Sequence, residues 1–168
     1  MTLSPEYLHY FTSIIDPTNG ASFPELARAL ENPGQPSEAD CPYYSNCLPP
    51  GWLPPPGVKL YRRKSDSREP AADEVETLLT AGQVPVLGIS IPEGFLSPTP
   101  PWLISADGPN RGLHAVVAVG LGTADTSRCF LVRNSWGTEW GDNGHAWLDD
   151  AFLDRHLHDV LALTGEVT

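Results

Sequence analysis

The spacing of apolar residues predicts two helices near the N-terminus. Residues 5–15 carry apolar side chains at helical spacing, behind Ser4 as an N-cap and a proline at the first helical position. Ser22 and Glu25 have the spacing of a capping box, and they open a second helix that ends near Asn32. The first part of the chain is therefore expected to be helical.

Further along the chain, short runs of β-branched residues replace the helical spacing of apolar residues. A third helix is predicted over 73–81, with Gly82 in the position that commonly follows a helix end. The apolar run 84–91 predicts a buried strand. Further strand candidates in the last third are 114–120, 129–133, 144–148 and 160–163.

Proline-rich segments separate these elements. Prolines within 35–70 remove backbone donors and disfavour both helix and central strand, so that only 58–61 is predicted as a short strand there. Residues 92–101 are predicted to form a second proline-rich loop. Helices first and antiparallel strands last predict an α+β fold.

Composition narrows the classes of partner. The chain has 168 residues, and its 10 Lys+Arg against 21 Asp+Glu give a formal net charge of −11. Nucleic acid is not an expected partner because phosphate contacts need clustered cations, and the one basic run, 62–64, is interpreted as a solvated loop.

No apolar run reaches about 18 residues, so no membrane partner is expected. No signal peptide is visible, which favours the cytoplasm and leaves the compartment unknown.

The three cysteines, Cys41, Cys47 and Cys129, leave the redox state open. A Cys41–Cys47 disulfide and a chain with free thiols both fit the sequence. His156 and His158 are interpreted as side chains of an exposed segment rather than metal ligands, and no zinc-type spacing of Cys and His is present. The sequence predicts neither a metal nor another cofactor.

The chemically informative residues are His114 and Asn134. His114 opens one apolar strand and Asn134 ends the next, and a hairpin with its loop near 123–127 would place them side by side. The amide oxygen of the asparagine can then accept from one imidazole N–H, which leaves the other ring nitrogen free to face a nucleophile. Trp136 can cover this hydrogen bond and exclude water.

The segments around these two residues resemble the papain-like (C1) cysteine peptidases. Residues 114–120 are similar to the family's His-Ala-Val-x-x-Val-Gly strand, and 134–144 to its Asn-Ser-Trp-Gly-x-x-Trp-Gly-x-x-Gly segment. The resemblance implies a papain-like α+β fold, with a helical lobe and a lobe made of an antiparallel sheet or half-barrel. It also implies that His114 is the catalytic base, that Asn134 orients it and that Trp136 shields the pair.

Weaker similarity extends upstream and covers nearly all of the chain. Asn19, Gly20 and Ala21 occupy the place of the family's Asn-Gly-Gly loop, whose backbone binds extended peptide. Together with Leu113, which precedes the implied catalytic histidine, they are the residues expected to bind a peptide.

The nucleophilic cysteine of the family has no counterpart at the expected distance. In the family it lies in a Cys-Gly-x-Cys-Trp motif, about 130–150 residues before the histidine, and this motif does not occur in the chain. Cys41 and Cys47 lie in proline-rich turns, and Cys129 is expected to be buried as a small hydrophobe. The fold is therefore expected to lack the N-terminal central helix that carries the cysteine.

Three functions remain open. One is a pseudoenzyme, catalytically incomplete as an isolated chain, that binds a peptide or protein. The alternative is the larger part of a split or truncated cysteine peptidase, whose nucleophile comes from another chain or an upstream segment. The third is a structural subunit with a filled cleft. The expected layout is a partial helical lobe over 1–45, a proline-rich crossover over 46–70 and a β lobe with the His/Asn site over 71–168.

Overall fold

The computed structural model describes residues 1–12, 21–43 and 51–167. The chain forms two compact units, one made of 1–66 with 164–168 and the other of 67–163. Within the described ranges, no helix has the length and apolarity needed to span a bilayer. The three-part domain layout expected from the sequence stays a prediction.

The described part of the first unit contains two helices, α1 (Pro5–Thr12) and α2 (Phe23–Glu31). The N-cap predicted for α1 is confirmed, because the backbone N–H of Tyr7 donates to Ser4 Oγ at 3.2 Å. The predicted end of this helix, at residues 13–15, lies outside the described residues.

The predicted start of α2 is also confirmed. The backbone N–H of Ser22 donates to the Glu25 carboxylate at 2.8 Å, and the backbone N–H of Glu25 donates to Ser22 Oγ at 3.4 Å. These reciprocal bonds satisfy two backbone donors that a helix start leaves without an intrahelical acceptor.

Between α2 and the sheet, isolated bridges replace regular strands. Leu3 pairs with Ser37, and Gln35 pairs with Tyr61. The strand predicted over 58–61 is therefore wrong, since this segment contributes only the bridge at Tyr61. A strand forms just after it, at β1 (Arg63–Arg68), where a solvated loop was expected. Its residues are polar on both faces, so the sequence carries no alternation that would reveal a strand.

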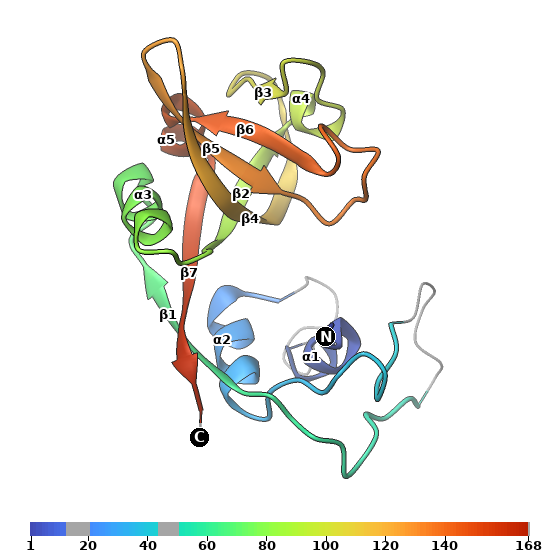
Figure 1. Ribbon diagram of the computed structural model, residues 1–168. Coiled ribbons are helices and arrows are strands. Elements are labelled where there is room, and N and C mark those ends of the chain that lie inside the picture. Colours follow the sequence, from blue (N-terminus) through green and yellow to red (C-terminus); the bar gives the residue numbers. More distant parts are fainter. Residues whose placement is uncertain (13–20, 44–50, 168) are drawn as a thin grey trace. The chain divides into compact units, whose positions relative to one another are not determined.

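The remaining strands lie mainly in the second unit. They are β2 (Val86–Pro92), β3 (Leu103–Ile104), β4 (Asn110–Ala124), β5 (Ser127–Arg133), β6 (His145–Asp149) and β7 (Leu157–Glu166). They join β1 in one sheet of order β1-β7-β2-β4-β5-β6-β3 (Figure 1). The β2–β4, β2–β7, β4–β5 and β5–β6 pairs are antiparallel, as predicted, but β3 runs parallel to β6. The sheet is therefore mixed at that edge.

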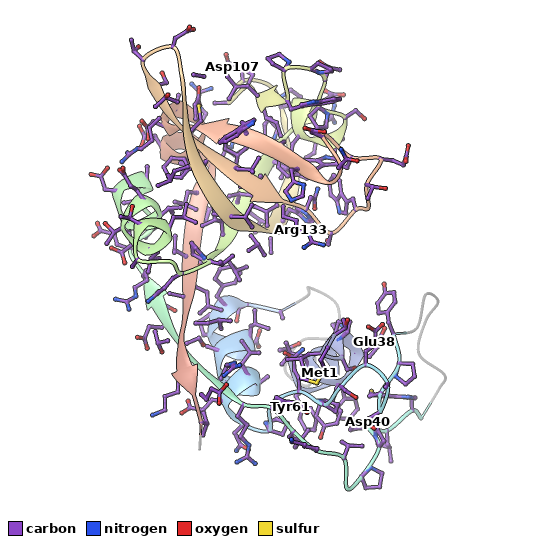
Figure 2. All side chains as sticks on the ribbon, in the orientation of Figure 1. Met1, Glu38, Asp40, Tyr61, Asp107 and Arg133 are labelled. Carbon is purple, nitrogen blue, oxygen red and sulfur yellow. The ribbon has the colours of Figure 1, made fainter. Side chains whose placement is uncertain are left out.

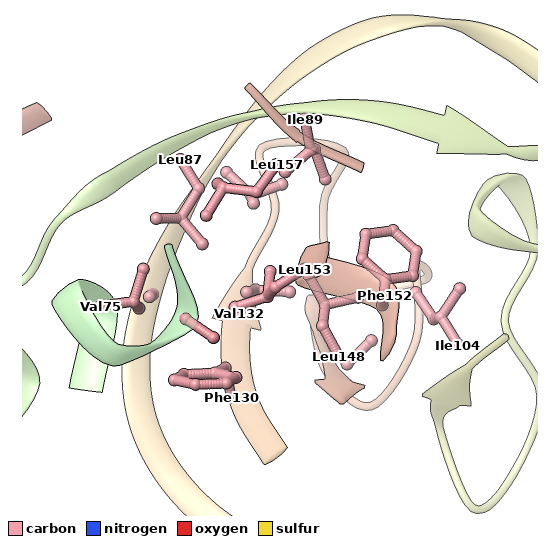
Figure 3. Close-up of a cluster of buried hydrophobic side chains, with 14 of the residues drawn as sticks. Val75, Leu87, Ile89, Ile104, Phe130, Val132, Leu148, Phe152, Leu153 and Leu157 are labelled. Carbon is pink, nitrogen blue, oxygen red and sulfur yellow. The ribbon is translucent and has the colours of Figure 1, made fainter. Parts of the chain in front are cut away.

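Helices α3 (Ala72–Thr80) and α5 (Asp150–His156) complete the core of this unit. Figure 3 shows their apolar side chains meeting those of the strands, and Phe130 and Phe152 are fully buried there. Burial of such a side chain contributes roughly 1.5–3 kcal/mol. This core fixes the strands whose ends carry the predicted site.

The sequence predicts neither α5 nor a further, shorter helix between β2 and β3. The one-turn helix α4 (Glu93–Leu96) interrupts the loop expected over 92–101, and it buries Phe95 completely. Four residues give too little periodicity for such a turn to be recognised from the sequence.

The exposed segment predicted around His156 is wrong at that residue, because α5 carries its imidazole into the core with 6% exposure. His156 Nδ1 lies 2.8 Å from Ser90 Oγ, and Nε2 lies 2.8 Å from the Ala106 carbonyl oxygen. Both ring nitrogens are thus hydrogen-bonded, which explains how the core accommodates this polar side chain. His158, on β7, is exposed as expected.

Candidate active site

The β4–β5 hairpin brings His114 and Asn134 together. The strands pair with Val117 opposite Arg133, so the residue after β5 lies near the beginning of β4. His114 Nε2 lies 2.8 Å from Asn134 Oδ1, which confirms the expected hydrogen-bond distance. The hairpin turns within the predicted range, between Ala124 and Ser127.

A second hydrogen bond fixes the amide of Asn134. The backbone N–H of Ser135 donates to Asn134 Oδ1 at 2.7 Å. Because this oxygen is an acceptor, the imidazole nitrogen that faces it must donate, so His114 carries a proton on Nε2. His114 Nδ1 has no hydrogen-bond partner among the described residues, and in the neutral ring it keeps its lone pair.

The loop after β5 is held by backbone contacts that require glycine. The N–H of Asn134 donates to the carbonyl of Gly144 at 2.9 Å. Gly141 has φ +59°, and a Cβ there would lie 2.1 Å from the carbonyl oxygen of His145. No other residue fits that position without moving the chain, which gives the Trp-Gly-x-x-Trp-Gly spacing a local physical reason.

Aromatic rings pack around the His114 imidazole. The Trp136 ring lies beside it, with centroids 4.6 Å apart, and remains 42% exposed. Phe95 contacts both rings, with centroids 5.8 Å from His114 and 5.7 Å from Trp136. The Trp140 indole N–H donates to the Phe95 carbonyl at 2.8 Å and so ties α4 to this cluster. Sequence reasoning missed Phe95 because it lies in a segment expected to be a loop.

The structure does not test the other predicted site residues as a group. Asn19 and Gly20 lie outside the described residues, and Ala21 is an exposed residue of the first unit. Leu113 belongs to the second unit, where its side chain is 78% exposed next to His114. Their expected role in binding a peptide stays a prediction.

The described cysteines do not supply a nucleophile for His114. Cys129 is 2% exposed and pairs with Gly122, eight positions beyond His114 along β4, roughly 26 Å away. Burial, with a smaller contribution from Asp149 and Asp150, raises the pKa of the Cys129 thiol above its ordinary value. Cys41 is a buried free thiol, and Cys47 lies outside the described residues.

One polar group of the pair is left unsatisfied. Asn134 is 7% exposed, and its Nδ2 has no hydrogen-bond acceptor among the described residues. A buried donor without a partner costs about 1–3 kcal/mol. Within the same part of the chain, no three His, Cys, Asp or Glu side chains are grouped so that they could hold a metal ion.

Comparisons with known proteins agree with this geometry. Residues 104–152, which include His114, Asn134, Trp136 and Trp140, match the family model of papain family cysteine proteases. The chain is 29% identical over 139 residues to Peptidase 1 of Psoroptes ovis, a match that covers 79% of this chain and 41% of that protein. It is 59% identical over 32 residues to cysteine proteinase 2 of Entamoeba histolytica, covering 19% of this chain and 10% of that protein.

Residues 104–152 are thus similar to the papain family cysteine proteases, and the chain as a whole has their fold. Solved structures confirm the predicted papain-like α+β fold. Xylellain, a cysteine protease from Xylella fastidiosa, superposes with a TM-score of 0.77 at 22% identity, covering 97% of this chain and 70% of that one. A clostridial cysteine protease gives a TM-score of 0.75 at 17% identity and covers 99% and 47%. The chain matches less than half the length of the two curated relatives named above.

Among the described residues, the site has an imidazole and an amide that holds its orientation, but no thiol lies within reach of the imidazole. An imidazole whose Nδ1 is free and whose Nε2–H is held by an amide oxygen is suited to accept a proton from a nucleophile. The exposed Trp136 ring leaves one side of the pair open to solvent or to another segment.

Proposed function

We propose that this chain supplies the His/Asn half of a cysteine peptidase active site, and that the thiol comes from a segment outside these 168 residues. The observation that carries the proposal is the His114–Asn134 hydrogen bond, which leaves His114 Nδ1 free beside Trp136. The substrate is a peptide or protein, and the reaction is hydrolysis of a peptide bond.

In this reaction, His114 Nδ1 takes the proton of the incoming thiol. The thiolate sulfur attacks the scissile carbonyl carbon, a C–S bond forms, and the C–N bond breaks as Nδ1–H gives its proton to the departing amine. A water molecule, deprotonated by the same nitrogen, then hydrolyses the thioester and returns the thiol. Asn134 keeps the ring oriented throughout, because its oxygen holds Nε2–H.

Trp136 and Phe95 protect the His114–Asn134 hydrogen bond in this proposal. Their rings cover the imidazole and keep water away from Nε2. A hydrogen bond with less competition from water holds the imidazole more firmly. These ring contacts form within the chain itself, so they are present before a thiol binds.

The unpartnered Asn134 Nδ2 also supports a segment that lies elsewhere. A buried amide donor normally has an acceptor, and the described residues offer it none. An acceptor on the thiol-bearing segment would satisfy this donor and add to the affinity of that segment.

The alternative is a protein that binds peptides without cleaving them. The retained base-and-amide geometry does not favour it, because peptide binding alone needs no fixed imidazole tautomer. The sequence feature that favours it is the absence of a Cys-Gly-x-Cys-Trp motif from the 168 residues.

A hydrolysis assay distinguishes the split peptidase from the peptide-binding protein. The 168-residue chain alone is expected not to cleave a fluorogenic peptide. The same chain preceded by a helical segment with a Cys-Gly-Ser-Cys-Trp start is expected to cleave it. His114→Ala in that fusion should lower kcat/KM by at least about 100-fold.

His158→Ala is the matched control, because this histidine of the same unit is exposed and belongs to β7, which β2 separates from β4 in the sheet. It should leave the activity of the fusion unchanged. A folded fusion that binds the peptide with no cleavage would support the binding protein instead.

A further inference from the structure

A cavity lies on the second unit, and its lining does not include His114, Asn134 or Trp136. Its volume is about 350 Å³, and its lining includes Trp102, Leu131, Asp142, Asn143, His145 and Trp147. None of its lining residues belongs to the proposed catalytic set, so the inference below is independent of the proposed function.

The Trp147 ring makes a flat wall of this cavity. Trp147 is opposite Leu131 in the β5–β6 register, so both lie on the face of the sheet that points away from Phe130 and Val132. The ring extends over Gly122, where a Cβ would come within 2.9 Å of Trp147 Cζ3. Gly122 therefore leaves the space in which the indole lies against β4.

Trp102 brings a second indole to the cavity through an unfavourable backbone conformation. Its φ is +66°, a left-handed value that costs a bulky residue free energy. The Trp102 carbonyl accepts from the backbone N–H of Trp147 at 2.8 Å, which couples the two positions. Because a tryptophan at a positive φ costs free energy, its presence at position 102 indicates that the indole itself has a function.

The turn between β5 and β6 adds mainly hydrogen-bond acceptors. His145 Nδ1 lies 3.0 Å from the Asn143 carbonyl oxygen, so it carries the proton, and the neutral ring keeps Nε2 as an acceptor. Asn143 Nδ2 donates to Asp142 Oδ1 at 2.9 Å, which leaves the second carboxylate oxygen of Asp142 to accept from a ligand. A matching ligand carries several O–H or N–H donors.

The charge around the cavity is close to balanced. Asp142 is its one acidic lining residue. Arg133, labelled in Figure 2, is directly opposite His145 in the β5–β6 register and on the same face of the sheet. Arg133 is therefore a basic residue next to the cavity-lining His145, so charges of both signs lie in or beside the cavity, which favours a neutral ligand over an ionic one.

We propose that this cavity binds a neutral hexopyranose unit of an oligosaccharide. A pyranose ring offers an apolar C–H face to an indole and hydroxyl groups to acceptors at its edge. A cavity near 350 Å³ with aromatic walls and a few polar groups falls in the size range of small-ligand sites.

The competing ligand is an organic cation, which would also be attracted to indole faces beside a carboxylate. Arg133 opposes it electrostatically, so tetramethylammonium serves as the probe for this alternative.

The test titrates the 168-residue chain with maltotriose, cellotriose and triacetylchitotriose, followed by tryptophan fluorescence and saturation-transfer NMR. At least one sugar should bind saturably with a Kd of about 10 mM or tighter. Gly122→Ala, which displaces the Trp147 ring, and Asp142→Asn should each weaken that binding by at least about fivefold.

Trp52→Phe is the matched control, because it removes an indole of the first unit that does not line the cavity, and it should leave the Kd unchanged. Circular dichroism identifies any variant that fails to fold. Three outcomes would overturn the proposal: no saturation with any of the sugars, saturable binding of tetramethylammonium alone, or an unchanged Kd in folded Gly122→Ala and Asp142→Asn.

Discussion

Asn134 determines the geometry of the candidate active site because one oxygen atom receives two N–H groups. The backbone N–H of Ser135 at 2.7 Å fixes that oxygen, and His114 Nε2 at 2.8 Å then has to donate to it. The tautomer of the base thus follows from a backbone contact rather than from the imidazole itself.

Substitution of Asn134 should change this tautomer. In the neutral state of the ring, 15N NMR should show His114 as the Nε2–H form, and Asn134→Ala should give a mixture with the Nδ1–H form. Asn143→Ala, in the same loop, should leave the His114 spectrum unchanged. A mixed tautomer in the unmodified chain would contradict the assigned donor.

The buried Cys129 thiol gives a stability prediction with a defined sign. Burial raises its pKa above the ordinary 9.0, and burial likewise raises the pKa of Tyr7 above 10.0. The unfolded state therefore loses these protons first as the pH rises. The corresponding stabilisation is complete below about pH 8 and is lost as the pH rises past about 9 towards the folded pKa values.

The free energy of unfolding, measured with urea, should accordingly be lower at pH 10 than at pH 7. Cys129→Ala should reduce this difference without abolishing it, because Tyr7 still contributes. An equal difference in both chains would contradict the role assigned to the thiol.

At the scale of elements, the core between α3, α5 and the sheet holds the His/Asn hairpin in place. Phe130 is fully buried on β5, opposite the 38% exposed Leu121 on β4. The two residues share one rung of the hairpin but differ in burial.

Phe130→Ala should therefore lower the free energy of unfolding by about 3–5 kcal/mol, whereas Leu121→Ala should lower it by less than about 1 kcal/mol. If Phe130→Ala prevents folding, Phe130→Leu should still fold, with a loss of about 1 kcal/mol. Equal losses for the two alanine variants would show that this rung is not packed as described.

The elements predicted from the sequence are those that carry strong local signals. The capping box at Ser22, the β-branched run of β2 and the His114–Asn134 hairpin all follow from spacing within a few tens of residues. The polar strand β1, the two-residue β3 and the one-turn α4 depend on tertiary partners, so no local pattern indicates them.

The difference between local signals and tertiary contacts also explains which site residues the sequence predicts. His114, Asn134 and Trp136 were found because they belong to one continuous motif region. Phe95 was missed, since it reaches the imidazole from the one-turn helix α4, which has no local sequence signal. His156 was assigned to an exposed segment because its partners, Ser90 and Ala106, lie far away in the sequence.

At the scale of the whole molecule, the chain has a papain-like fold and a prepared base but lacks a Cys-Gly-x-Cys-Trp motif. The longest helices in the described part of the chain have nine residues. In the proposed function, the His114–Asn134 pair activates a thiol that another segment brings to it.

The most direct test measures the alkylation rate of that thiol. A helical peptide with a Cys-Gly-Ser-Cys-Trp start, its second cysteine replaced by alanine, is treated with iodoacetamide at about pH 6, where a free thiol is mostly protonated. Fluorescence anisotropy of the labelled peptide reports binding separately.

The 168-residue chain is expected to bind the peptide and to accelerate alkylation by at least about tenfold. His158→Ala should keep this acceleration, and His114→Ala should lose it while still binding the peptide. Binding with an unchanged alkylation rate, or acceleration that survives His114→Ala, would show that His114 does not activate the thiol.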